Sequence, residues 1–344
     1  MTSRSRVFFM GSNVPECLAG YVGFLRKGVV PVMINPAVQA DAVHKLMEAY
    51  KPDFIFRPVT SVSDGKYELI PLKSHPRDLY ERLAVILTTS GSTGSPKFVR
   101  LSYENLESNV RSIIQYLGMD ASHRAITTLP MTYSYGLSII HSHLLAGGSL
   151  VLTEASLVDR KFWDLVKTAE PTNFGGVPFI YEMLKKLRFS RMNLPSLKYL
   201  TQAGGHLSAD LVKEFREICA EKGIQFFVMY GQTEATARMA YMPREKLQGR
   251  EESIGIAIPG GEFFLTDEEG AVITSSETPG ELCYRGKNVS LGYAECREDL
   301  ARGDDNHGVL RTGDVAKTDT EGFYYVVGRK KRFLKIFGNI LVPN

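Results

Sequence analysis

The segment 89–97 (TSGSTGSPK) combines small residues, hydroxyl groups and one cation, as a phosphate-binding loop does. Glycines let the backbone approach an anion, and successive N–H groups and hydroxyls can surround phosphate oxygens. Lys97 adds a positive charge at the far end. The segment is not a Walker A loop, because Ser95 and Pro96 precede the lysine and a strand, not a helix, is expected to follow. By itself such a loop is also compatible with a plain turn.

Two further segments place carboxylates where a nucleotide could use them. Glu234, in YGQTEAT (230–236), follows the apolar run FFVM. It is therefore expected at the carboxyl end of a strand, where α/β sheets bind ligands and where it could hold Mg²⁺. Asp314, in RTGD (311–314), stands beside a turn glycine and could accept both hydrogens of a ribose diol. The alternatives are an ordinary helix-start glutamate and an ordinary turn aspartate.

Charge argues against a nucleic-acid partner. The chain has 41 basic and 38 acidic residues, and the formal charge of +3 is too small to predict nucleic-acid binding. A local basic cluster is a solvated surface or a weak phosphate-binding patch. It consists of Arg329, Lys330, Lys331, Arg332 and Lys335.

These segments need elements to position them, and the hydrophobic pattern predicts α/β layering. A strand (83–89), the loop and a second strand (97–102) form a hairpin, and Ser102 is the expected N-cap of a helix whose apolar residues recur at helical spacing from Leu106 to Leu117. After about Gly260 short strands alternate with acidic and glycine turns, which predicts a β-rich subdomain. The other predicted strands are 7–10, 29–34, 54–56, 149–153, 199–203 and 225–229, and the other predicted helices are 15–26 and 37–50.

Composition is that of a folded globular protein with two or three structural units. The 344 residues can bury a sizeable core, and 44% are hydrophobic and 23% charged. The four cysteines lack disulfide or metal spacing, so we expect reduced thiols and a cytoplasmic protein. No stretch approaches the ~18 apolar residues of a membrane helix.

Taken together and in this order, the motifs resemble those of the adenylate-forming superfamily (AMP-dependent synthetases and ligases), which includes acyl-CoA synthetases, aryl-CoA ligases, adenylation domains and luciferases. The matching segments are TSGSTGSPK (89–97), YGQTEAT (230–236), GELCYRG (280–286), RTGD (311–314) and GRKKRFLKIFG (328–338). The resemblance implies α/β subdomains over 1–260, a small β-rich distorted barrel over 261–330, and a hinge with the start of a C-terminal domain over 331–344. It also implies that family members continue past the hinge.

The resemblance implies ATP, Mg²⁺ and CoA as ligands and assigns roles to residues. Thr233 and Glu234 would contact the α-phosphate and Mg²⁺, with Glu234 as the metal ligand. Lys331 would be a catalytic residue at the hinge about which the C-terminal domain of family members rotates. Asp314 would bind the ribose and Arg329 would support the same nucleotide. The remaining ATP-binding residues would be Thr89, Ser90, Gly91, Ser92, Thr93, Gly94 and Lys97 at the β- and γ-phosphates, and Gly204, Gly205, His206 and Tyr230 at the adenine, with Gly231 and Gln232 beside it.

The resemblance places the acyl site at the segment 130–137. Tyr133 takes the place of the aromatic residue that gates the carboxylate, and Tyr135 and Gly136 follow it. The tyrosines are equally compatible with a packed core pair, and His141 and His143 are expected to belong only to the next helix. No acidic residue lies between Asp120 and Glu154, which favours a plain acyl or aryl acid over an amino acid.

The leading hypothesis is an enzyme that activates a carboxylic acid as acyl-AMP with release of pyrophosphate and then forms a CoA thioester. Three alternatives stay open: a ligase that loads an acyl carrier protein, a luciferase-type oxygenase, and a non-catalytic nucleotide-binding protein without the moving domain. The last alternative is disfavoured by the presence of Lys97, Glu234, Asp314 and Arg329, because mutation without selection for catalysis would be expected to replace some of them.

Overall fold

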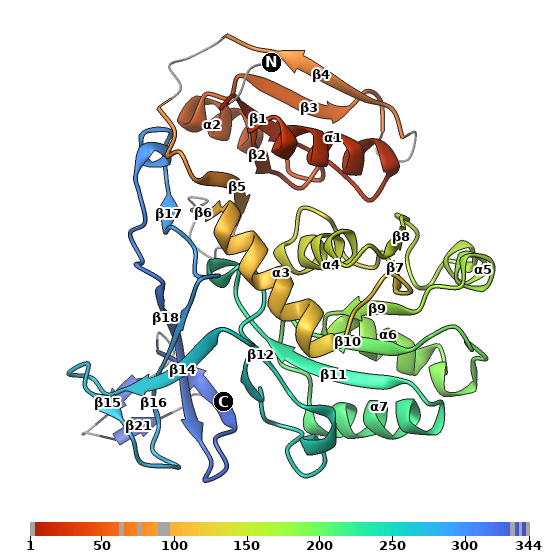
Figure 1. Ribbon diagram of the computed structural model, residues 1–344, viewed down its shortest axis with the longest axis vertical. Helices are drawn as coiled ribbons and strands as arrows, with labels where there is room; N and C mark the ends of the chain where they lie inside the picture. The colour runs from red at the N-terminus through yellow and green to blue at the C-terminus, as the bar shows by residue number, and fades with distance from the viewer. Residues whose placement is uncertain are drawn as a thin grey trace.

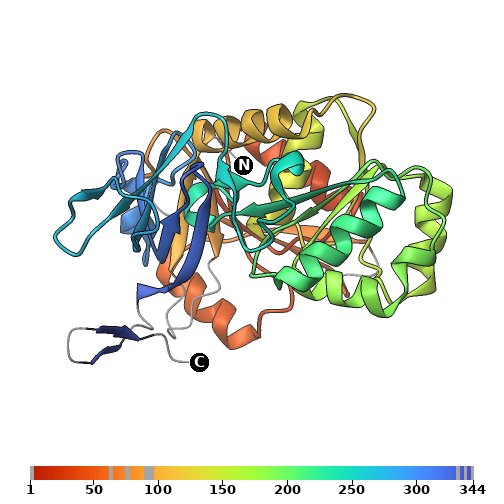
Figure 2. The same cartoon turned by 90° about the horizontal axis from the view of Figure 1, so that it is seen from below.

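The computed structural model describes residues 4–61, 65–73, 78–88 and 97–330, together with the backbone of two short strands, β20 (Leu334–Ile336) and β21 (Asn339–Leu341). Two large sheets with helices on their faces make up most of the described chain, and a third, antiparallel sheet lies to one side of them (Figures 1 and 2). The α/β layering followed by a β-rich part confirms the predicted fold class.

The first sheet is largely parallel at its centre. Its strands in spatial order are β17 (Tyr293–Ala294), β6 (Phe98–Ser102), β5 (Leu83–Thr88), β2 (Val30–Met33), β1 (Arg6–Phe9), β3 (Phe54–Pro58) and β4 (Tyr67–Pro71). The buried apolar runs of β1, β2 and β5 follow from their central position, because helices cover both faces of a parallel sheet. The predicted β5–β6 hairpin is present, with the two strands antiparallel.

The second sheet is parallel except at one edge, where β12 and β13 run antiparallel. Its strands in order are β13 (Ile256–Ala257), β12 (Ala240–Tyr241), β11 (Gln225–Tyr230), β10 (Tyr199–Gln202), β9 (Asn173–Gly176), β7 (Arg124–Ile126) and β8 (Ser149–Val151). The third sheet is antiparallel, and its strands in order are β15 (Val272–Ile273), β14 (Gly261–Thr266), β16 (Gly280–Gly286), β18 (Val309–Thr318) and β19 (Tyr324–Arg329).

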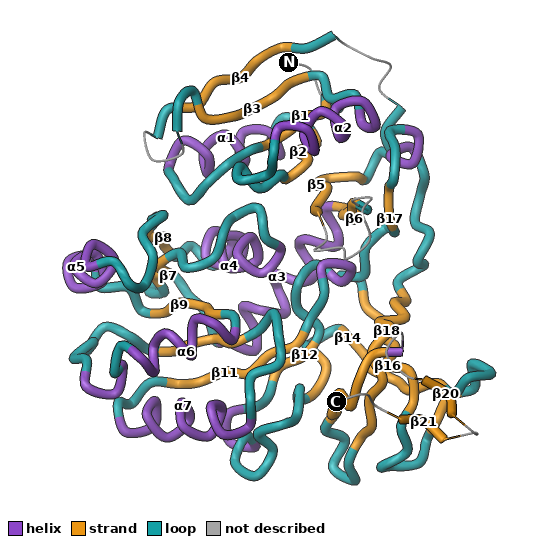
Figure 3. The backbone as a smooth tube through the Cα atoms, turned by 180° about the vertical axis from the view of Figure 1, so that it is seen from behind, coloured by secondary structure: helices purple, strands orange, loops and turns teal. Residues whose placement is uncertain are grey.

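The helices form three layers around the two large sheets. They are α1 (Pro15–Arg26), α2 (Ala40–Tyr50), α3 (Tyr103–Leu117), α4 (Ser134–Leu145), α5 (Arg160–Ala169), α6 (Pro178–Lys186) and α7 (Ala209–Glu221), with 3₁₀ turns η2 (Phe189–Arg191), η3 (Thr233–Ala235), η4 (Arg244–Lys246) and η5 (Glu298–Ala301). Seen from behind, α3 and α4 lie between the two sheets (Figure 3). In the described part of the chain, no helix is long and apolar enough to cross a membrane.

Helix α4 is buried on nearly all sides because it packs against both sheets. Leu137 and Ile140 join the core of the first sheet, whereas Tyr135 and Ile139 join residues of the second. A helix enclosed in this way needs an apolar sequence around its whole circumference, as SYGLSIIHSHLL provides. His141 and His143 belong to this helix, as expected. The helix thereby carries the predicted acyl segment into the interior.

Helix α3 begins as the sequence predicts. Ser102 accepts a hydrogen bond from the backbone N–H of Asn105, and the Asn105 side chain accepts one from the Ser102 N–H, which completes a capping box. Its Leu106 packs with the first sheet, and Ile113 and Leu117 pack with Tyr199 and Phe227 of the second. The helix therefore fixes the spacing between the two sheets.

Candidate active site

The carboxyl ends of parallel strands β10 and β11 meet at one edge of the second sheet, and two predicted nucleotide-binding segments follow them. Residues 204–206 come after β10 and are exposed. Gly204 has a φ of +80°, and a Cβ atom there would lie 2.6 Å from the Tyr133 hydroxyl. Only glycine fits this position, because both its backbone conformation and the approaching tyrosine exclude a side chain.

The segment after β11 turns back on itself within a few residues. A Cβ atom on Gly231 would lie 1.8 Å from the carbonyl oxygen of Ala237, so the loop requires glycine. Thr236 and Ala237 both have positive φ, which is costly for residues with a side chain. Asn288 holds the strained turn by donating to the carbonyl oxygens of Ala235 (2.9 Å) and Arg238 (3.1 Å).

A buried carboxylate joins the β11 segment to the third sheet. Asp314 is 3% exposed, and its Oδ2 accepts hydrogen bonds from the Tyr230 hydroxyl at 2.6 Å and from Gln232 Nε2 at 3.0 Å. Its Oδ1 lies 2.9 Å from Nε of Arg329. Burial and then the negative charge of Asp314 raise the pKa of Tyr230 far above its usual range, so this hydroxyl stays a donor. Four of the predicted nucleotide-binding residues therefore meet at one point.

The interpretation of Asp314 as a turn residue is wrong. It lies within strand β18 and pairs across the sheet with Arg329 of β19. Gly313 has a φ of +73°, an irregularity that resembles a turn in the sequence but sits inside the strand. The aspartate is therefore fixed by the sheet, and its side chain belongs to a buried hydrogen-bond network.

Glu234 and Lys97 are brought together by a residue that the sequence did not single out. The Tyr293 hydroxyl donates to Oε1 of Glu234 at 2.7 Å, and Nζ of Lys97 lies 5.8 Å from the centre of the same tyrosine ring. Lys97 also pairs with Glu295 at 2.9 Å. Burial and then the charge of Glu234 raise the pKa of Tyr293. Tyr293 belongs to the edge strand β17, and only this long-range pairing could have revealed its place.

The predicted acyl segment lies directly beside the β11 loop. The hydroxyl oxygens of Ser134 and Thr233 are 3.0 Å apart, which joins the start of α4 to η3. Tyr135 is buried, and its hydroxyl donates to the carbonyl oxygen of Thr201 at 2.9 Å. The half-buried Tyr133 lies over Gly204, and Gly136 packs against the carbonyl oxygen of Pro130, where a Cβ atom would come within 2.3 Å. Burial raises the pKa of both tyrosines.

Some predicted residues fall outside the described part of the chain. These are Thr89, Ser90, Gly91, Ser92, Thr93, Gly94 and Lys331. Within the described residues, no group of three or more His, Cys, Asp or Glu side chains could hold a metal ion by itself. Among the described residues, a cation bound at Glu234 would therefore find too few carboxylate or imidazole ligands and would need others, such as those of a substrate or of water. This suits Mg²⁺, which commonly binds one or two carboxylates together with phosphates and water.

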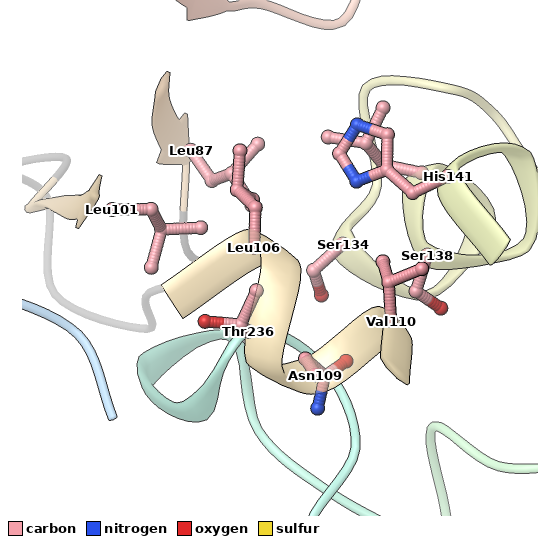
Figure 4. A pocket seen from close by; sticks show the side chains of 10 residues that line it. Leu87, Leu101, Leu106, Asn109, Val110, Ser134, Ser138, His141 and Thr236 are labelled. Atoms are coloured by element: carbon pink, nitrogen blue, oxygen red, sulfur yellow. The ribbon is translucent and has the colours of Figure 1, made fainter. Parts of the chain in front are cut away.

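Space around α4 is limited in this structure. A cavity of about 10 Å³ lies between α3, α4 and the loop after β11, and Ser134, Ser138 and Thr236 contribute polar atoms to its largely apolar lining (Figure 4). This volume is close to that of a single water molecule. Asn109 also lines it, and its Oδ1 has no hydrogen-bond partner among the described residues. A ligand entering here needs side chains to move.

Known relatives of the chain are ligases. It is 30% identical over 267 residues to a probable CoA ligase of Humulus lupulus, an alignment that covers 76% of this chain and 48% of the relative. It is 30% identical over 288 residues to the oxalate–CoA ligase of Arabidopsis thaliana, covering 82% of this chain and 54% of the relative. The chain thus spans about half the length of the curated relatives it matches.

Solved structures show the same fold. The O-succinylbenzoate coenzyme A synthetase of Bacillus subtilis, solved in complex with ATP and magnesium ion, matches with a TM-score of 0.83 at 22% identity, covering 100% of this chain and 73% of that one. The family described as AMP-binding enzyme matches residues 1–294. The match extends over most of the chain, from the first sheet through the β11 loop to β17, and the protein belongs to the family of AMP-binding enzymes.

Proposed function

We propose that this chain is the ATP-binding part of an enzyme that activates a carboxylic acid as acyl-AMP, releases pyrophosphate and passes the acyl group to CoA. The relatives that are CoA ligases support this class of reaction. The observation that carries the proposal is the buried cluster of Tyr230, Gln232 and Asp314, in which the two motifs meet although Tyr230 and Asp314 are 84 residues apart.

Asp314 suits the ribose of ATP. A carboxylate offers about four acceptor positions, and Tyr230, Gln232 and Arg329 use three of them. The remaining capacity can accept a ribose hydroxyl without loss of the existing bonds. Because the network fixes the carboxylate on β18, the sugar would be held at a defined distance from the loop that carries Thr233 and Glu234.

The phosphate end of the site is where charge must be neutralised. Attack of a carboxylate on the α-phosphate brings two anions together, and a bound Mg²⁺ supplies positive charge as pyrophosphate leaves. Glu234 would hold the ion through Oε2, while the Tyr293 bond to Oε1 fixes the carboxylate. Lys97 would exchange its exposed pair with Glu295 for a phosphate, and Thr233 would donate to the α-phosphate. The acid would enter beside Tyr133 and Tyr135.

Thermal unfolding with ligands tests the proposal. A ligand that binds only the native state stabilises it by RT ln(1 + [L]/Kd), about 2.7 kcal/mol at a hundredfold excess over Kd. We expect Mg²⁺-ATP and non-hydrolysable acyl-AMP mimics to raise the melting temperature. Glu234→Gln should abolish the Mg²⁺ dependence of ATP binding, whereas Glu245→Gln, at an exposed glutamate on η4, should leave it unchanged.

The acceptor is tested separately, by offering CoA and an acyl carrier protein to the enzyme that contains this chain. Thioester formation with CoA supports the proposal. Transfer to the carrier protein and not to CoA would show that the carrier protein, and not CoA, is the acceptor. Failure of ATP, AMP and every mimic to stabilise the chain would contradict the proposed nucleotide site.

A further inference from the structure

Arg238 is a buried cation without an acidic partner. Three arginines in the described part of the chain rank among its largest fully buried side chains: Arg6, Arg100 and Arg238. Arg6 pairs with Asp53 at 3.4 Å, and Arg100 pairs with Asp305 at 2.5 Å. Arg238 is 2% exposed, and no carboxylate of the described residues lies within ion-pair distance of it. Of the three, only Arg238 lacks a counter-ion among the residues that the structure describes.

The groups around Arg238 are neutral. The Nε atom of Arg238 donates to the Ser138 hydroxyl at 3.2 Å, and Nη1 donates to the Tyr116 hydroxyl at 3.1 Å. Nη1 also lies 3.6 Å from the sulfur of Met229, and the guanidinium carbon lies 5.1 Å from the centre of the Tyr135 ring. These contacts orient the guanidinium, but none of the described residues supplies an anion to offset its charge. Arginine keeps its proton in proteins, so the cost of burying it is not relieved by deprotonation. An anion from outside the fold would relieve it.

The position of Arg238 is on the acyl side of the site. It stands four residues after Glu234, on the same loop, and its neighbours Tyr135 and Ser138 belong to α4. Ser134, one helical turn before Ser138, touches Thr233. Figure 4 shows Ser134 and Ser138 on α4 beside the same small cavity. Ser134 and Ser138 are separated by a rise of about 6 Å, one helical turn, and we take this as the order of the spacing between the Thr233 hydroxyl and the Arg238 Nε that they contact.

We propose that the acid activated at this site is a short dicarboxylic acid and that Arg238 binds its distal carboxylate. The inference rests on the proposed function, which places the reacting carboxylate near Thr233. A spacing of about one helical turn suits a chain on the order of four to six carbons between the two ends. Guanidinium and carboxylate can pair through two parallel hydrogen bonds.

A matched pair of acyl-AMP mimics tests this on the unmodified chain. Both are sulfamoyl-adenosine compounds with the same four-carbon acyl chain, one ending in a carboxylate and the other in its methyl ester. We expect the carboxylate mimic to bind about thirtyfold more tightly, the effect of one charge-assisted pair. Titration calorimetry measures both dissociation constants, and AMP serves as a ligand that does not reach Arg238.

Arg238→Met removes the charge and keeps an unbranched, flexible side chain that is shorter than that of arginine. It should reduce the ratio of the two dissociation constants to near one while AMP affinity stays as in the parent. Ser138→Ala keeps the guanidinium and should retain the preference. If Arg238→Met fails to fold, as judged by AMP binding, the comparison on the parent chain decides.

The outcomes separate the two proposals. If neither mimic nor AMP binds, the proposed function fails and this inference with it. If both mimics bind the parent chain equally well, the proposed function stands and the dicarboxylate is wrong. A preference for the carboxylate that survives in Arg238→Met would also overturn the inference, because another group would then recognise the distal end.

Discussion

Replacing Asp314 by alanine should destabilise the protein as well as weaken nucleotide binding. The change leaves the Tyr230 hydroxyl without its acceptor in a part-buried site, whereas Gln232 Nε2 loses one acceptor and keeps the carbonyl oxygen of Thr312. A donor left without an acceptor costs about 1–3 kcal/mol, and a bond lost at a donor that keeps another acceptor costs about 0.5 kcal/mol. The pair with Arg329 adds little, because that side chain is 66% exposed and its charge is screened by solvent. The expected loss in the free energy of unfolding is therefore about 2–3 kcal/mol.

Differential scanning calorimetry can detect this loss. The entropy of unfolding is about 2.1 cal/mol/K per residue, so for a chain of this size the melting temperature should fall by about 3–4 °C. Asp267→Ala is the matched control, since Asp267 accepts a hydrogen bond from the Ala271 N–H at 2.8 Å in a tight turn. It should cost under about 1 kcal/mol. Equal melting temperatures for Asp314→Ala and the parent would refute the role of the buried network.

Three further predictions follow from individual side chains. Burial lowers the pKa of His141 and His143 to about 4 from 6.5, so between these values only the unfolded chain takes up the protons. Stability should therefore fall as the pH drops through this range, by on the order of 1.4 kcal/mol per unit for each histidine, and urea unfolding at pH 7, 6 and 5 measures it. Gly23→Ala, on an open face of α1, should raise the free energy of unfolding by about 1 kcal/mol. Gly231→Ala should lower it strongly, because the new Cβ atom would meet a backbone oxygen, and chemical unfolding compares the two variants. Ser102→Ala should cost about 1 kcal/mol by loss of the α3 cap, and an unchanged urea midpoint would contradict it.

The fold was largely predictable because its signals are local. Pro15 at the first helical position and the apolar spacing after it predict α1 with the observed bounds. Ser102 marks the start of α3 through a cap that involves only its own neighbours. Buried strands such as β11 appear as continuous apolar runs, since both faces of a parallel sheet are covered.

The candidate site was predictable only where a motif marks it. Tyr293 reaches Glu234 by pairing in β17, a contact across 59 residues that no local pattern contains. Asp314 looked like a turn residue because Gly313 precedes it, whereas the sheet decides its conformation. Arg238 was missed for a different reason. In a sequence an arginine suggests a solvated surface, and only the folded chain shows that this one is buried without a carboxylate.

Strand β17 has a consequence for how the protein is made. It pairs with β6, so Tyr293 lies beside Val99, and Arg100 donates to carbonyl oxygens of Leu291 and Gly303. During synthesis, the edge of β6 that pairs with β17 stays unpaired until almost two hundred later residues have left the ribosome. An exposed edge of this kind can pair with other chains, so this stage is the one most open to aggregation. Since such distant contacts also slow folding, a nascent chain of this protein should depend on chaperones until β17 has emerged.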